Sequence, residues 1–132
     1  MELNTLLFLV GRILFGGYFI MSSLNHFRHA DMMAGYAGSK GVKSPKMAVY
    51  FSGLLLLVGG LGVLLGVWVQ LAVLCLVLFL IPVSFMMHAF WKITDQNMKM
   101  PEYINFTKNM ALLGAALMLL AISTPWALSL AL

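Results

Sequence analysis

Acidic side chains are scarce in this sequence. Only four of its 132 residues are Asp or Glu, against eight Lys or Arg, and we expect no acid inside its long apolar stretches. Two basic residues, Arg12 and Lys108, do fall within such stretches. A basic side chain at the centre of a bilayer costs about 2.5–3.5 kcal/mol on insertion scales, so each one indicates a functional or structural role. The pattern predicts that these cations contact backbone carbonyls, lipid phosphates, or an anionic or carbonyl-bearing ligand.

Charged residues and cysteine are also few. Charged residues make up 9% of the chain and hydrophobic residues 62%, and Cys75 is the single cysteine. A soluble domain of this size needs more polar surface, so the composition indicates one integral membrane domain. A single cysteine excludes an intrachain disulfide and dithiol chemistry. We find no catalytic triad, phosphate loop or long basic tract, so we expect no nucleic-acid partner and no chemistry of those kinds.

Four apolar stretches are long enough to cross a bilayer, whose hydrocarbon core of about 30 Å needs roughly 20 helical residues. The tract from Met47 to Trp91 is too long for one crossing, so it must fold back, with the turn expected near Gly66. The predicted spans are residues 3–27, 47–66, 69–90 and 102–123, and the last begins after Pro101. The predicted fold class is all-α, an integral membrane bundle of four antiparallel transmembrane helices in one domain, residues 1–132.

Small residues and helix-end residues refine this fold. Glycines within the spans, among them Gly16 and Gly60, predict closely packed helices. Between the first two spans, residues 30–37 predict a short helix that lies in the membrane interface. Ser44 is then expected to cap the second span, with Pro45 at its first helical position.

Basic residues lie mainly in two loops, residues 28–45 and 92–100. The opposite side of the predicted bundle has a nearly uncharged hairpin and Glu2. By the positive-inside rule both loops are cytoplasmic and both termini lie outside. The lipid bilayer, and anionic phospholipid at the basic loops, are the expected partners.

Polar residues within the spans gather at the predicted cytoplasmic end. The candidate ligand-binding residues are Arg12, nearer the outer side, and a cytoplasmic group of Asn25, His26, His88, Asn105, Lys108 and Asn109. Four helices that converge at this depth predict a polar pocket open to the cytoplasm. Two structural alternatives remain open, because Lys108 can reach interfacial phosphates and Arg12 can bridge helix ends with Asn4 or Gln70 as partners.

His26 and His88 come from different spans at a similar depth, as two haem or metal ligands would. Haem proteins typically show stronger paired signals, and no third ligand accompanies these histidines, so we expect neither haem nor a metal site. A quinone is the one cofactor class that remains to be considered.

Several short segments, taken together, resemble the DoxX family. They are residues 11–14 and 22–27 in the first span, 59–66 in the second, 88–91 at the end of the third and 106–114 in the fourth. The resemblance extends over nearly the whole chain and implies a four-helix protein of the bacterial inner membrane. The family takes its name from a subunit associated with thiosulfate:quinone oxidoreduction and quinol oxidase complexes. Many relatives have Lys at the position of His26 and Glu in the second span, where this chain has Ser52 or Gly53.

Three hypotheses for the function follow. The leading one is an accessory membrane subunit without catalytic activity of its own, linked to quinone-dependent redox or oxidative-stress metabolism through a membrane or cytoplasmic redox partner. Arg12 and Lys108 can donate hydrogen bonds to a carbonyl or an anion, whereas no residue of the chain carries electrons. The second is a small transporter or lipid-binding carrier that uses the polar pocket, for which a homo-oligomer would ease alternating access. The third is a scaffold whose Gly-rich spans bind a partner protein.

Overall fold

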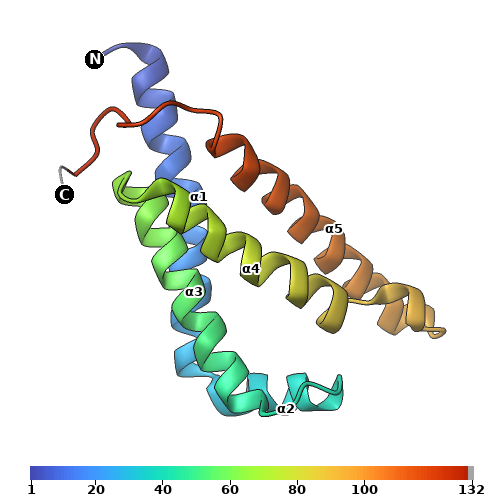
Figure 1. Ribbon diagram of the computed structural model, residues 1–132. Helices are drawn as coiled ribbons and strands as arrows, with labels where there is room; N and C mark the ends of the chain where they lie inside the picture. The colour runs from blue at the N-terminus through green and yellow to red at the C-terminus, as the bar shows by residue number, and fades with distance from the viewer. Residues whose placement is uncertain (131–132) are drawn as a thin grey trace.

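The computed structural model describes residues 1–130, and its secondary structure in that range is helical, without strands. Four long helices are accompanied by one short helix and one 3-10 turn (Figure 1). Their bounds are α1 Leu3–Arg28, α2 Ala30–Ser39, α3 Pro45–Leu65, α4 Val69–Met87, η1 Phe90–Lys92 and α5 Gln96–Leu119. The all-α fold class is thereby confirmed.

The helix ends have local causes in the sequence. The chain reverses between α3 and α4 at Gly66, whose φ of 69° lies in the left-handed region that glycine adopts without steric cost. Pro45 is the first residue of α3, as expected, but Ser44 makes no side-chain capping hydrogen bond. The helix α5 begins at Gln96, earlier than the expected start after Pro101, because the Asp95 side chain accepts a hydrogen bond from the Asn97 amide at 3.0 Å and caps it.

The helices α1 and α3 pack backbone to backbone. A Cβ atom on Gly16 would lie 2.8 Å from the carbonyl oxygen of Gly60, and one on Gly60 would lie 2.9 Å from the carbonyl oxygen of Gly16. The buried Ser23 hydroxyl also donates to the Gly53 carbonyl oxygen at 2.8 Å. Small residues at such contacts let helices approach closely where lipid removes the hydrophobic drive for association. The expected packing role of these two glycines is therefore confirmed.

Two neighbouring glycines of α1 test this contact. We expect Gly16→Ala to lower the free energy of unfolding by about 1–2 kcal/mol, because the added methyl overpacks the α1–α3 contact. A methyl group on Gly17 would meet nothing within 4 Å, so Gly17→Ala should be neutral or slightly stabilising through helix propensity. Thermal unfolding in detergent compares the two variants. Equal midpoints would show that the close approach does not hold the helices together.

The long helices form two arms that meet at one end and diverge at the other (Figure 1). One arm is α1 with α3, and the other is α4 with α5. The main buried cluster fills the region where the arms meet, and it includes Phe19, Val63, Leu76 and Trp126. Toward α2 the arms separate, and α2 packs on α3 through a small second cluster of Ala30, Ala34 and Val49. The bundle is thus wedge-shaped rather than uniformly closed.

Three helical segments are long and apolar enough to cross a membrane. They are Leu3–Arg28, Pro45–Leu65 and Val69–Lys92, as judged by length and composition in the described chain. The helix α5 has sufficient length, but polar residues through its first half keep it outside this group. A fourth span and an interfacial position for α2 therefore stay predictions.

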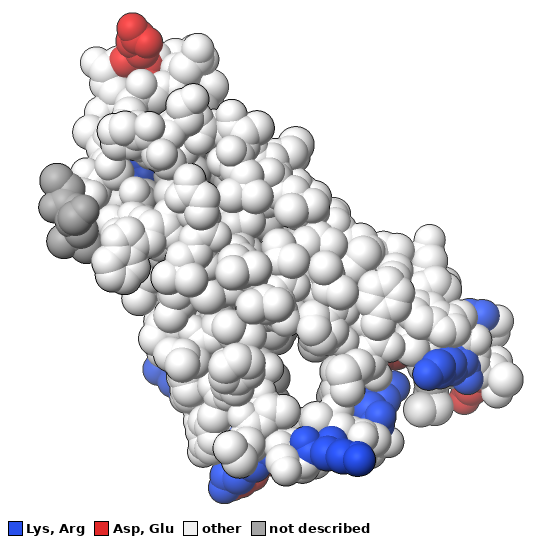
Figure 2. Space-filling view, in the orientation of Figure 1, with Lys and Arg blue, Asp and Glu red and all other residues white. Residues whose placement is uncertain are grey.

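Charge is distributed unevenly along the wedge. Figure 2 shows most Lys and Arg side chains, with a few acidic ones among them, at the end that carries α2 and η1, whereas Glu2 lies at the far end. We call the first of these the basic end; its cations are Arg28, Lys40, Lys43, Lys46, Lys92 and Lys99. The opening between the two arms faces this basic end (Figures 1 and 2).

Candidate ligand-binding cavity

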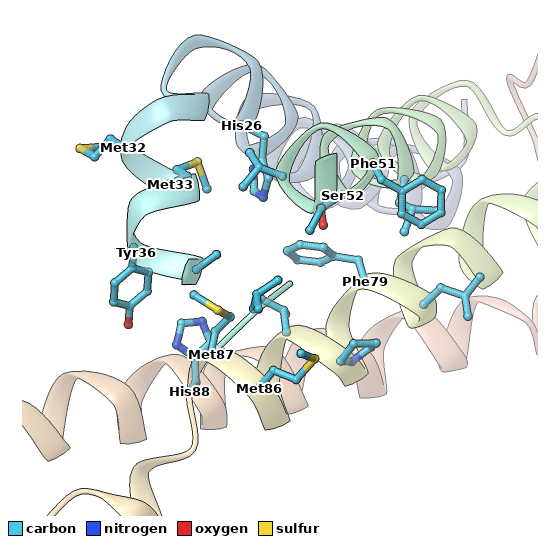
Figure 3. Close-up of a pocket in the computed structure, with 18 residues that line it drawn as sticks. His26, Met32, Met33, Tyr36, Phe51, Ser52, Phe79, Met86, Met87 and His88 are labelled. Atoms are coloured by element: carbon cyan, nitrogen blue, oxygen red, sulfur yellow. The ribbon is translucent and has the colours of Figure 1, made fainter. Parts of the chain in front are cut away.

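A cavity of about 690 Å³ lies in the opening of the wedge. Its walls come from α2, α3 and α4 and are almost wholly apolar, with Met33, Phe51 and Phe79 among the larger side chains (Figure 3). Figure 2 shows the surface hollowed at this place. We refer to this space as the wedge cavity. Volumes of about 300–1,000 Å³ are typical of small-molecule sites, which also combine apolar walls with a few polar groups.

Polar side chains enter the wedge cavity from several elements. They are His26 at the end of α1, Tyr36 on α2, Ser52 on α3 and His88 at the end of α4 (Figure 3). Four polar residues in a wall of eighteen place hydrogen-bonding groups at defined points of an apolar space. Such a space suits a ligand with an apolar body and a small polar part.

His26 is fixed by its own helix and by one aromatic neighbour. Its Nδ1 lies 2.8 Å from the carbonyl oxygen of Ser22, one turn earlier in α1. The Phe79 ring and the imidazole form a T-shaped pair, with 5.7 Å between ring centroids. His26 is only 7% exposed. The ring therefore has one orientation, in which Nδ1 is occupied by backbone.

A hydrogen-bonded network closes one side of the cavity. The carboxylate of Glu102, on α5, lies 2.6 Å from Nδ1 of His88 and accepts a hydrogen bond from the Tyr36 hydroxyl at 2.5 Å. Partial burial and the adjoining carboxylate raise the pKa of Tyr36 above its usual range. The phenol therefore keeps its proton and remains a donor to Glu102. This network links α2, α4 and α5 across the basic end.

Glu102 is the residue that sequence reasoning missed. We expected no acid inside the apolar stretches, yet Glu102 is buried within α5, with 9% of its surface exposed. Glu102 is the first residue of the predicted span 102–123, so the expectation of no acid within the spans was wrong at that boundary. The available signal was its spacing, because Glu102, Asn105 and Asn109 recur at i, i+3 and i+7 on one helical face.

Arg12 lies outside the wedge cavity and is satisfied by backbone. Its guanidinium donates to the carbonyl oxygens of Val63 at 3.2 Å and Leu64 at 2.8 Å, at the C-terminal turn of α3. It also donates to Ala127 at 2.7 Å and to Leu128 at 3.3 Å, in the segment that follows α5. The last turn of a helix has unpaired carbonyls and a negative dipole end, so it suits a cation.

Arg12 bridges helix ends, which is one of the two structural alternatives left open by the sequence, but its partners differ from those expected. The hydrogen bonds that Arg12 donates go to four backbone carbonyls, and neither Asn4 nor Gln70 is among its partners. The guanidinium carbon also lies 5.7 Å from the Phe8 ring centroid and 5.6 Å from that of Trp126. Arg12 thus ties α1 to the end of α3 and to the C-terminal segment.

The remaining candidate residues do not line the wedge cavity. Lys108 is exposed, with its Nζ 5.9 Å from the ring centroid of Tyr18. Asn25 is exposed, Asn105 is half-buried and Asn109 is buried. Of the seven residues expected to bind a ligand, the structure brings His26 and His88 together on one cavity. Within residues 1–130, no group of three or more metal-binding side chains occurs.

Residues 7–89, more than half of the chain, match the DoxX family model. The chain belongs to the DoxX family. No similar curated protein and no similar solved structure was found.

The DoxX match contains the whole wall of the wedge cavity. Every lining residue, from His26 to His88, falls within residues 7–89, while Glu102 lies beyond the matched segment. In this DoxX protein the acid that holds His88 and Tyr36 therefore comes from the part of the chain outside the match. Two members of the network, Tyr36 and His88, thus lie within the match, and the third, Glu102, lies outside it.

Proposed function

We propose that this DoxX protein binds a membrane-soluble amphiphile of the quinone class in the wedge cavity and acts as an accessory subunit of quinone-dependent redox metabolism. The observation that carries the proposal is the apolar cavity of about 690 Å³ with two histidines on its wall. A ring would pack against side chains such as Phe79 and Met86, which line the cavity, and its polar substituents would meet imidazole nitrogens. An apolar tail would continue into the surrounding lipid.

The charge distribution supports a particular placement in the membrane. Basic side chains gather at the end where the cavity opens, and the positive-inside rule assigns such an end to the cytoplasmic face. In this placement the α2 and η1 end is cytoplasmic, α2 lies in the interface, and α5 completes four crossings of a bacterial inner membrane. Lys and Arg there would attract anionic phospholipid.

Filling the cavity tests the proposal. Val83 lines it on α4, whereas Leu74 on the same helix is exposed and is not part of its wall. We expect Val83→Trp to lower the binding of decylubiquinone at least tenfold, because the indole occupies the space of the ligand. Leu74→Trp should bind as the native protein does.

Binding can be measured with purified protein in lipid nanodiscs, together with mass spectrometry of co-purified quinones and lipids. Thermal unfolding of both tryptophan variants confirms that each is folded. Unchanged binding and unchanged co-purified lipid in Val83→Trp would place any ligand elsewhere and overturn the proposal.

A further inference from the structure

The backbone partner of His26 determines which of its two ring nitrogens carries the proton. A carbonyl oxygen has lone pairs and no proton, so the contact of 2.8 Å between His26 Nδ1 and Ser22 O requires the proton on Nδ1. The ring packs against Phe79, and no Asp or Glu side chain forms an ion pair with it in the described chain. Removal of a charged ring from water without a counterion is costly, so the neutral ring is favoured. In that tautomer, Nε2 has a lone pair and acts as an acceptor.

The Nε2 atom of His26 remains available to a ligand. Within residues 1–130 it makes no hydrogen bond, yet no buried, unpartnered side-chain nitrogen or oxygen occurs in that range. It therefore keeps some accessible surface, although the residue is only 7% exposed. The cavity is the open space that His26 adjoins, and Figure 3 shows the ring between Met33 and Ser52.

A second histidine, His88, also lines the cavity. Its Nδ1 faces the Glu102 carboxylate at 2.6 Å, and the second carboxylate oxygen already accepts from the Tyr36 hydroxyl. A carboxylate that accepts on both oxygens holds the imidazole proton on Nδ1. Nε2 of His88 accepts when the ring is neutral and donates when the ring is charged, so His88 by itself does not select the ligand. Nε2 of His26, in a wall that is mostly apolar, matches a ligand that donates a hydrogen bond.

We propose that the wedge cavity selects a ligand with a hydroxylated ring, of the phenol or quinol class, over the corresponding carbonyl or ether compound. This inference rests on the function proposed above and specifies which form of the ligand binds. A ring hydroxyl donates to His26 Nε2, whereas a quinone carbonyl or a methyl ether brings a second acceptor to a lone pair. A neutral hydrogen bond accounts for about a three- to tenfold preference.

Competition binding separates the two forms. The probe is tritiated 4-octylphenol, bound to purified protein in nanodiscs, and the competitors are unlabelled 4-octylphenol and its methyl ether, which have the same tail. We expect the phenol to compete three- to tenfold better than the ether. Decylubiquinol should likewise compete better than decylubiquinone, and better than monoolein, whose hydroxyls are aliphatic.

Two histidine variants provide the matched comparison. His26→Phe keeps a ring beside Phe79 but removes the acceptor, so the preference should fall below about twofold, as expected when a single hydrogen bond is lost. His29→Phe makes the same change at an exposed position outside the cavity wall and should keep the preference.

The outcomes distinguish this inference from the proposed function. Binding of phenol and ether with equal affinity, tighter binding of the ether, or a preference that persists in His26→Phe would overturn the hydroxyl selection while the cavity still binds. Tighter competition by monoolein than by decylubiquinol would contradict the requirement that the donating hydroxyl belongs to a ring. No saturable binding of any probe would reject the proposed function as well.

Discussion

Replacement of Arg12 by methionine should lower the free energy of unfolding by about 2–4 kcal/mol. The guanidinium makes four hydrogen bonds to carbonyls of α3 and of the segment after α5. Hydrogen bonds to a charged group contribute about 1.5–3 kcal/mol each, and the cost of burying the cation offsets part of their sum. Methionine fills similar volume but leaves these carbonyls without a donor. The C-terminal segment would then lose its hydrogen bonds to α1, while the contact between Trp126 and Phe8 would remain.

The protein offers its own reporter for this experiment. Cys75, the single cysteine, is buried in α4, so a fluorogenic maleimide should react with it only on unfolding. Arg28→Met is the matched control, because Arg28 is exposed at the end of α1, and it should change stability by less than about 0.5 kcal/mol. Arg12→Lys should be intermediate, since one ammonium cannot span carbonyls on two segments. Equal midpoints for the two methionine variants would contradict the bridging role of Arg12.

Glu102→Leu should lower the free energy of unfolding by about 2–3 kcal/mol and loosen α2. The change leaves the Tyr36 hydroxyl and His88 Nδ1 without their shared acceptor. Loss of a partner costs about 1–3 kcal/mol for a buried polar group, and less for Tyr36, because this residue is 43% exposed and its hydroxyl can bond water. Amide hydrogen exchange should become faster over residues 30–39, because Tyr36 is the side-chain link from α2 to α5.

A second acid provides the control for Glu102. Asp31 pairs with Lys46 at 2.9 Å, but both side chains are largely exposed, at 88% and 58%. Exposed ion pairs contribute about 0–1 kcal/mol, so Asp31→Leu should have a small effect. Glu102→Gln should lie between the two, because its carbonyl oxygen still accepts one hydrogen bond. Should Glu102→Leu leave both stability and exchange in α2 unchanged, the network would have no structural role.

Helices and their order were predictable from the apolar stretches and from the glycine and proline residues at helix ends. Apolar stretches of sufficient length define α1, α3 and α4, and Gly66 and Pro45 mark ends that local backbone preferences determine. The beginning of α5 was harder to predict, because its first half is polar and the helix begins at Gln96, after the cap Asp95, rather than after Pro101. The capping signal is Asp95, and residues 96–101, which follow it, lack the apolar pattern of the other long helices.

The candidate site was predictable only in part. Histidines near the ends of α1 and α4 stood out as polar residues in apolar surroundings, and they do share a cavity. Depth along the helix does not specify the face, however, so Asn25, Asn105 and Lys108 were grouped with them although none lines it. Glu102 was overlooked because its partners, Tyr36 and His88, are distant in sequence.

The amino-acid sequence by itself determined that this protein is helical and membrane-embedded, because a chain with 62% hydrophobic residues must place its backbone in helices where water is absent. It also determined where the chain turns, since the backbone preferences of residues such as Gly66 and Pro45 are local. Only the tertiary structure decided that Arg12 binds backbone carbonyls rather than an anion, and that the two arms diverge to leave a cavity beside His26. Both depend on which faces of distant helices meet, and side-chain order alone does not specify those contacts.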